Sequence, residues 1–305
     1  MTTFKNQLKT VVLLGAMSAL LVGLGGLVAP SYLHLFGALA LLMNLGAYLF
    51  SDRIVLSMHR ASEVGPHEAP ELHAMVAELS ARAGIPKPRL FVIPEEQPNA
   101  FATGRNPEHG VVAVTEGIVR LLSRRELRGV IAHELAHIKN RDILISSIAA
   151  AGASVISYVA HALSFGALFG GSNQDDEGES SSPFGGILVA LVAPLAATLV
   201  QLGISRSREY LADATGAEIS GDPEALASAL LKLERASQAI PVSEPTPATA
   251  SLFIVNPFGA METASRIFST HPHTAERVRR LREMARERGG KEPGLRGIAM
   301  APSER

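Results

Sequence analysis

The stretch SRRELRGVIAHELAHIKN, residues 123–140, decides how the rest of the sequence is interpreted. Its apolar side chains recur at helical spacing and predict a helix over residues 124–140. Ser123 is the expected N-cap, because Glu126 follows three residues later as in a capping box. The apolar stripe around the polar centre of the helix consists of Leu127, Val130, Ile131 and Ile138.

The centre of this helix is an HExxH motif, His133 to His137. Residues at i and i+4 share one face of a helix, so the two imidazoles converge on one zinc ion. Glu134 is adjacent and can reach a water on that zinc. The alternative is two surface histidines on an ordinary helix, and the predicted helix favours the metal site.

A catalytic zinc needs a third protein ligand and an open position. An HExxHxxGxxH motif would need a glycine at position 140 and a histidine at position 143, but Asn140 and Ile143 stand there. A later helical segment, residues 205–218, offers acidic donors instead. If Glu209 is the ligand, Asp213 one turn later could accept the remaining N–H of a ligand histidine. Spacing alone leaves the choice open among Glu209, Asp213 and Glu218.

Apolar residues are concentrated in four runs. The chain has 305 residues, of which 47% are hydrophobic and 19% charged, whereas soluble domains carry about 25% charged residues. A hydrocarbon core of ~30 Å requires roughly 20 apolar residues as helix. We therefore expect the four runs to form transmembrane helices. The alternative is that the third and fourth runs form a buried hairpin within a soluble domain. The runs are residues 11–29, 32–50, 143–170 and 184–204.

Basic residues indicate the orientation of these spans. Lys and Arg flank both predicted hairpins, while the connection Pro30-Ser31 and the acidic loop 172–183 contain neither. All four spans then agree on one orientation, with both termini and the soluble domain in the cytoplasm. The expected location is the cell (inner or plasma) membrane.

The remaining segments predict a mainly α domain with a small β-sheet (α+β), joined to the transmembrane helices. Its elements are helices over 67–83, 116–122, 124–140, 206–239 and 275–288, and strands over 88–94, 99–104 and 110–115. The predicted division is a hairpin at 1–50, the domain at 51–142 and 205–288, a second hairpin at 143–204, and a disordered tail at 289–305.

Other function classes find little support. The formal net charge is −1 and no basic stretch with aromatic residues occurs, so nucleic acid is not an expected partner. The absence of cysteine excludes disulfides, thiolate metal sites and a cysteine nucleophile.

Four motifs together resemble the HtpX membrane metalloproteases, which are gluzincin peptidases related to the CAAX prenyl proteases. They are HELAHIKNRD (133–142), SRSREYLADATGA (205–217), NAFATG (99–104) and FSTHPHTAER (268–277). The resemblance covers most of the chain and implies a gluzincin-like domain with one Zn²⁺ per chain. It implies Glu209 as the third metal ligand and Glu134 as the general base.

The resemblance also implies roles for three residues outside the metal set. Asn99 matches a position near the substrate backbone. His271 matches a residue that could donate to the developing oxyanion, although a helix-start turn at His271-Pro272 is an equal alternative. Arg277 matches a residue that could orient Glu209 or Asp213. The remaining histidines are interpreted as ordinary: His34, His59, His67, His73, His109, His161 and His273.

The function implied is quality control, the cutting of misfolded or damaged membrane proteins at the cytoplasmic membrane surface. We expect the substrate to lie extended along residues 99–104 or 110–114. Two alternatives remain. A CAAX-type protease would need more spans around a lipid chamber, and a zinc-binding scaffold would fill the fourth zinc position with a protein ligand.

Overall fold

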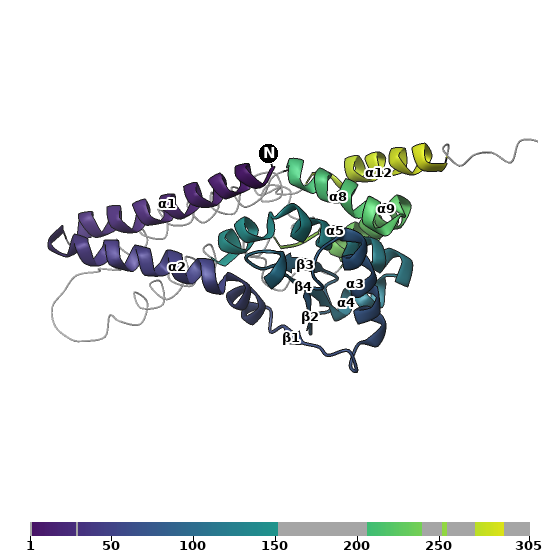
Figure 1. Cartoon of the computed structure of the whole chain (residues 1–305), viewed down its shortest axis with the longest axis horizontal. Helices are drawn as coiled ribbons and strands as arrows, with labels where there is room; N and C mark the ends of the chain where they lie inside the picture. The colour runs from purple at the N-terminus through teal and green to yellow at the C-terminus, as the bar shows by residue number, and fades with distance from the viewer. Residues whose placement is uncertain (1, 29, 152–205, 240–251, 255–271, 290–305) are drawn as a thin grey trace, which may run out of the picture.

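The computed structural model describes residues 2–28, 30–151, 206–239, 252–254 and 272–289, and these form an arm and a body. The arm is a helical hairpin of α1 (Thr2–Val28) and α2 (Leu33–Met58), joined by the short 3₁₀ helix Pro30–Tyr32. The two helices lie side by side and project from the body (Figure 1). The Asn44 side chain crosses between them, since its Nδ2 donates to Ser18 Oγ at 2.6 Å.

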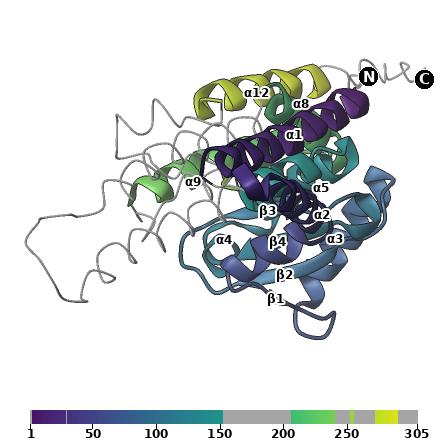
Figure 2. The same ribbon diagram turned by 90° about the vertical axis from the view of Figure 1, so that its left-hand side faces the viewer.

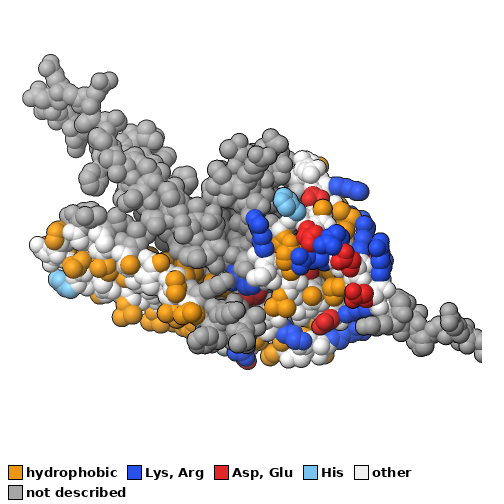
Figure 3. Space-filling view, turned by 90° about the horizontal axis from the view of Figure 1, so that it is seen from above, with side chains coloured by type: hydrophobic (Ala, Val, Ile, Leu, Met, Phe, Trp, Pro, Cys, Tyr) orange, Lys and Arg blue, Asp and Glu red, His pale blue; other side chains and the backbone are white. Residues whose placement is uncertain are grey.

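The surface of the arm is apolar. Leu41 and Leu42 are 71% and 66% exposed, and the outer part of the arm shows no charged side chain in the view of Figure 3. Within the described ranges, Pro30–Met58 is long and apolar enough to cross a membrane, and Thr10–Ala19 is a shorter apolar helix. The helices expected in the first two runs are confirmed, and α2 continues beyond residue 50.

The later runs lie largely outside the described residues. Residues 143–151 are helical and begin the third run. The rest of that run, the acidic loop 172–183 and the fourth run are not described, so the four-span topology stays a prediction.

The body contains a four-stranded sheet in the order β1-β2-β4-β3. The strands are β1 (Ser62–Glu63), β2 (Arg89–Ile93), β3 (Ala100–Thr103) and β4 (Val111–Thr115). The three predicted strands are confirmed, and β1 was not predicted because two residues carry no periodicity. β4 pairs with β2 in parallel and with β3 in antiparallel. Since both edges of β4 are used, a substrate cannot pair with 110–114. Among the described strands the two edges of the sheet are β1 and β3.

Proline sets the start of α3 (Pro70–Ala83). We expected this helix from residue 67, and that start was wrong. Pro70 suits the first helical position, but its ring excludes the preceding residue from the helical region, and Ala69 has φ −136°. The predicted end is confirmed, because Gly84 adopts the left-handed conformation with φ 69°.

The HExxH helix α5 (Arg124–Asn140) follows the short helix α4 (Glu116–Leu121). The predicted capping box is present: Ser123 Oγ accepts from the backbone of Glu126, whose carboxylate accepts from the Ser123 backbone. Glu126 also accepts from Ser228 Oγ and Lys232 Nζ of α9 (Pro223–Ala239), both at 2.7 Å. The helix cap therefore fastens α5 to a helix about a hundred residues later.

α5 lies at the centre of the body. Figures 1 and 2 place it between the sheet and the pair α8 (Arg206–Ser220) and α12 (Thr274–Gly289). Ile131, Leu135 and Ile138 of α5 are completely buried. The observed fold is thus mainly helical with a small sheet, as the sequence predicts, and its most protected helix carries the HExxH motif.

Candidate metal centre

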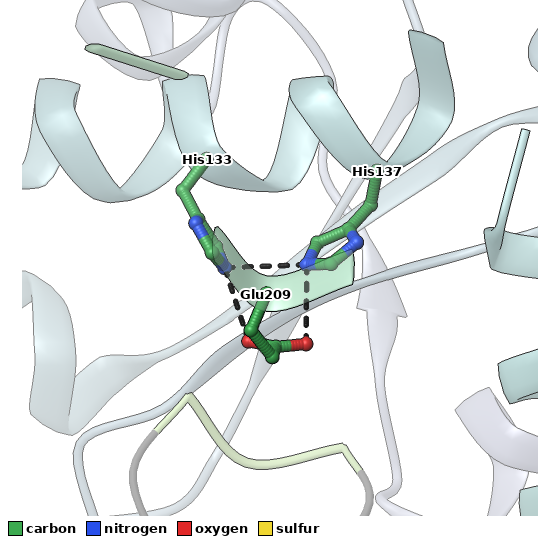
Figure 4. Close-up of side chains that lie close together, drawn as sticks. All are labelled: His133, His137 and Glu209. Carbon is green, nitrogen blue, oxygen red and sulfur yellow. Dashed lines mark hydrogen bonds and ion pairs between the residues drawn. The ribbon is translucent and has the colours of Figure 1, made fainter. Parts of the chain in front are cut away.

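His133 and His137 project from the same face of α5, as their spacing requires (Figure 4). Their Nε2 atoms lie 3.2 Å apart, and the two rings meet edge to face. His133 is 1% exposed. Two imidazoles on one tetrahedral zinc, with Zn–N bonds of about 2.05 Å, have nitrogens roughly 3.3 Å apart. The observed pair already has this separation.

Glu209 approaches the pair from α8. Its Oε2 lies 3.7 Å from His133 Nε2, and its Oε1 lies 3.7 Å from His137 Nε2. One ligand atom from each of the three residues lies within 4.8 Å of the other two. Gly216 permits this approach, because a Cβ there would lie 2.8 Å from the Cα of His133. The α8 backbone therefore packs directly on the turn that carries the first histidine.

The structure distinguishes among the three acidic residues that spacing leaves as candidates for the third metal ligand. Glu218 is exposed on α8. Asp213 is 4% exposed but turns to the other side of the ring, with Oδ1 3.0 Å from His133 Nδ1. Of the three, only Glu209 belongs to the cluster of possible metal ligands.

Arg277 of α12 holds Asp213 in place. Its Nε and one terminal nitrogen donate to the two carboxylate oxygens at 2.8 and 2.7 Å, and its other terminal nitrogen donates to the Ile254 carbonyl at 2.8 Å. Arg277 is 1% exposed and also lies 3.9 Å from Glu209 Oε2. This buried guanidinium connects α12 to α8 and to the backbone at residue 254.

Asp142 is a further carboxylate at the site that sequence reasoning missed. Its two oxygens accept from His137 Nδ1 at 3.1 and 3.2 Å, and the residue is 2% exposed. The signal available in the sequence was an acid five residues after the second histidine, just beyond the expected helix end. Each histidine thus faces a carboxylate through Nδ1.

This arrangement fits a metal cation. In the tautomer that carries the proton on Nδ1, beside Asp142 for His137 and beside Asp213 for His133, each Nε2 has a lone pair, and the two Nε2 atoms face each other and the Glu209 carboxylate. Three electron-pair donors at such distances repel one another unless a cation lies among them. Two imidazole nitrogens and one carboxylate are also the ligand set of a common class of catalytic zinc sites.

The electrostatics of the pocket agree with a cation site. Burial lowers the pKa of His137, but Asp142, Glu209 and Glu134 outweigh it and raise the pKa to about 10. Burial raises the pKa of Asp213, and Arg277 outweighs this to bring it to about 2. The ring of His137 is therefore in strongly anionic surroundings.

Glu134 lies beside the ligand set, at the wall of the same cleft. It is 4% exposed, and burial raises the pKa of its carboxyl to about 8. The cleft is lined by β3 residues 100–102 on one side and by residues 252–254 on another. A carboxyl of raised pKa next to a strand edge and three metal-ligating groups is suited to proton transfer.

Asn99 lies next to this cleft but contacts the chain itself. Its Nδ2 donates to the Leu252 carbonyl at 3.1 Å, and its Oδ1 accepts from the Ile254 N–H at 3.2 Å. Its contact with a substrate backbone stays a prediction. His271 and His161 lie outside the described residues. Among the described histidines interpreted as ordinary, none belongs to the metal cluster.

The model of peptidase family M48 matches residues 66–285, which include α5, α8 and most of α12. The chain belongs to peptidase family M48. This confirms the resemblance inferred from the motifs. An M48 chain with this His-His-Glu cluster is a metalloprotease.

Curated relatives of this M48 chain match nearly end to end. A protease HtpX homolog of Syntrophobacter fumaroxidans is 53% identical over 281 residues, covering 92% of this chain and 99% of the relative. One of Thermococcus kodakarensis is 52% identical, covering 92% and 97%. The crystal structure of S. mikatae Ste24p aligns at 18% identity and a TM-score of 0.48, covering 92% of this chain and 66% of that chain.

Proposed function

We propose that this M48 metalloprotease is a membrane-anchored zinc endopeptidase. His133, His137 and Glu209 hold one Zn²⁺, and Glu134 is the general base. The observation that carries the proposal is the meeting of the three donor atoms within 4.8 Å of one another, with Glu134 on the same cleft. Among the described residues the cluster has three ligands, which fits a catalytic zinc with a fourth position for water.

The chemistry follows from the positions of the side chains. A zinc ion held by His133, His137 and Glu209 would supply Lewis-acid chemistry to the water and the scissile carbonyl. Glu134 accepts a proton from the attacking water and delivers it to the leaving amine. Asp213 holds the His133 ring, and Arg277 holds Asp213. For His271, which lies outside the described residues, we propose donation to the developing oxyanion on the motif resemblance alone.

The substrate binds in extended form against β3. β3 lines the cleft and is one of the two edge strands among the described strands, which supports pairing of an extended chain along its outer edge. Asn99, at the start of this strand, lies close to the substrate backbone. Main-chain pairing gives loose sequence preference, which suits an enzyme with many clients.

The clients we propose are misfolded or damaged proteins of the cell membrane, cut at its cytoplasmic surface. The apolar helix Pro30–Met58 supports membrane anchoring. The third apolar run starts at Ile143, six residues after His137, and this short spacing supports a metal centre close to the bilayer. The basic residues that flank the runs support a multi-pass topology with cytoplasmic termini.

The test compares wild type, Glu134→Gln and Glu218→Gln, each purified in detergent with a zinc chelator. Zinc is then added, and cleavage of an unfolded model protein is followed by gel. We expect Glu134→Gln to bind zinc and to cut ~10²–10⁴-fold more slowly, since a general base contributes about this factor. The matched control Glu218→Gln, on the exposed face of α8, cuts like wild type.

Three results would count against the proposal. Equal cleavage by wild type and Glu134→Gln would remove Glu134 as the base. If wild type binds zinc but cleaves neither unfolded nor membrane proteins, the result would favour a zinc-binding scaffold. If it cleaves prenylated peptides and nothing else, the result would favour a CAAX-type protease.

A further inference from the structure

Asp142 has no role in the chemistry described above, yet it is one of the most buried carboxylates in the described part of the chain. Both of its oxygens are directed at a single atom, the Nδ1 of His137, at 3.1 and 3.2 Å. We propose that Asp142 is a positioning residue that accepts the His137 Nδ1–H, turns Nε2 toward the metal, and couples this ligand to the start of the third apolar run. The inference rests on the proposed zinc site.

The backbone brings Asp142 under the ring by ending α5 abruptly. Arg141 adopts a left-handed conformation with φ 56°, which is uncommon for a residue other than glycine. The chain then folds back, and the Asp142 N–H donates to the His137 carbonyl at 3.3 Å. Asp142 therefore contacts His137 through both its backbone and its side chain.

The same residue starts the next helix, residues 143–151. Ser146 Oγ donates to the Asp142 carbonyl at 3.3 Å. One residue further on, Ser147 Oγ lies 2.7 Å from Thr103 Oγ1 and accepts from the Gly104 N–H at 3.3 Å. Asp142, directly before the third apolar run, thus contacts a metal-ligating histidine, and the first turns of the run contact the end of the β3 edge strand.

The second carboxylate, Asp213, is arranged differently. Asp213 is bound on both oxygens by Arg277, so its pairing with His133 is fixed within the body. Asp142 belongs to the segment that leaves the body toward the predicted membrane span. A shift of that segment moves the partner of His137 while leaving the partner of His133 in place. Carboxylate partners of this kind fix the tautomer and ring orientation of a metal-ligating histidine and increase its basicity.

The test uses the full-length protein in detergent and measures its zinc dissociation constant by competition with a chromophoric chelator. The variants are Asp142→Ala, Asp142→Asn and Ser147→Ala. Asparagine keeps a carbonyl oxygen that can accept the Nδ1–H without the charge. Ser147→Ala changes a buried residue of the same helix that does not contact His137. Visible absorption of the Co²⁺-substituted protein reports ligand geometry, and the unfolding midpoint of each chelator-treated variant reports stability.

We expect Asp142→Ala to weaken zinc binding by about 10- to 100-fold and to change the Co²⁺ spectrum. Asp142→Asn restores most of the affinity, and Ser147→Ala binds zinc like wild type. Wild-type affinity in Asp142→Ala, equal losses in Asp142→Ala and Asp142→Asn, or a loss that only follows a lower unfolding midpoint would each overturn the positioning role. A wild type that binds no zinc would instead overturn the proposed function.

Discussion

The arm and the body of this protease differ in an unexpected way: the arm exposes apolar side chains, and the body buries charged ones. The arm exposes leucines such as Leu41 and Leu42, and α2 is mostly exposed. The body buries charges, including Arg277, Asp213 and Glu134, at its centre. An apolar exposed helix is stable in a lipid solvent, whereas buried charges are stable only when each has a partner. The two regions therefore depend on different surroundings, so a substitution in one region should leave the properties of the other unchanged.

The largest effect is expected from breaking the buried ion pair in the body. Arg277→Leu leaves Asp213 buried without its guanidinium, which costs about 3–5 kcal/mol of unfolding free energy. Denaturant unfolding of the detergent-solubilised protein measures this. The matched control is Arg279→Ala on the same helix, whose ion pairs are exposed and contribute about 0–1 kcal/mol. Similar losses in both variants would show that burial does not distinguish these pairs.

Charge in the arm should act on the membrane and leave the metal centre intact. Leu42→Arg places a cation near the middle of Pro30–Met58, at a cost of about 2.5–3.5 kcal/mol for insertion. We expect more protein in the alkaline-carbonate extract of membranes, with an unchanged zinc dissociation constant. A parallel fall in zinc affinity would mean that the arm and the body are not separable.

A glycine in each region sharpens the comparison. Gly216→Ala forces a methyl group against the backbone at His133 and should cost about 1–3 kcal/mol, as overpacking does. Gly46→Ala in α2 meets nothing within 4 Å, so it should not lower stability and should leave zinc affinity unchanged. Unfolding midpoints and zinc titrations of the two variants provide the measurement. An unchanged unfolding midpoint in Gly216→Ala would contradict the close packing of α8 on α5.

The smallest effect concerns pH and the helix cap in the body. Burial raises the pKa of Glu126, but Lys232, Ser228 and Ser123 outweigh it and lower the pKa from 4.5 to about 2. A lowered folded-state pKa contributes stability above the unfolded value, and this is lost as pH falls from 4.5 toward 2. Glu126→Gln should therefore be less stable than wild type at pH 7 by on the order of 1 kcal/mol, because Lys232 is partly screened by solvent.

The pH profile of Glu126→Gln has a clear signature. The difference in unfolding free energy between wild type and variant should shrink below about pH 4.5. Equilibrium unfolding at several pH values checks this. A difference that stays constant down to pH 2.5 would mean that the cap contributes through shape and not through charge.

Local signals explain what the sequence could predict. The capping box and the apolar stripe specify α5, and i, i+4 spacing is enough to pair His133 with His137. Apolar strands bounded by Pro and Gly specify β2, β3 and β4. Each of these features is determined within a few neighbouring residues, so the chain alone carries the information.

The features that the sequence did not predict depend mostly on contacts between residues distant in the chain or on an unusual backbone conformation. Choosing Glu209 over Asp213 and Glu218 requires knowing that α8 packs on α5 at Gly216, which spacing does not reveal. Asp142 was missed because Arg141 takes a left-handed conformation that no local signal predicts. The start of α3 is different, because it follows from the local restriction that Pro70 imposes on Ala69, whereas the apolar spacing alone extends the helix back to residue 67.

The short length of β3 has a consequence for what this protease can select. Four residues, Ala100 to Thr103, make up the strand, which spans ~13 Å at about 3.3 Å per residue. A polypeptide that pairs with it must offer a comparable length of backbone whose hydrogen-bonding groups are unoccupied. Intact helices and sheets have already used theirs, so a chain enters only where its own structure has opened. Under the proposed binding mode, such an edge selects an unfolded stretch of about this length and not a particular residue sequence.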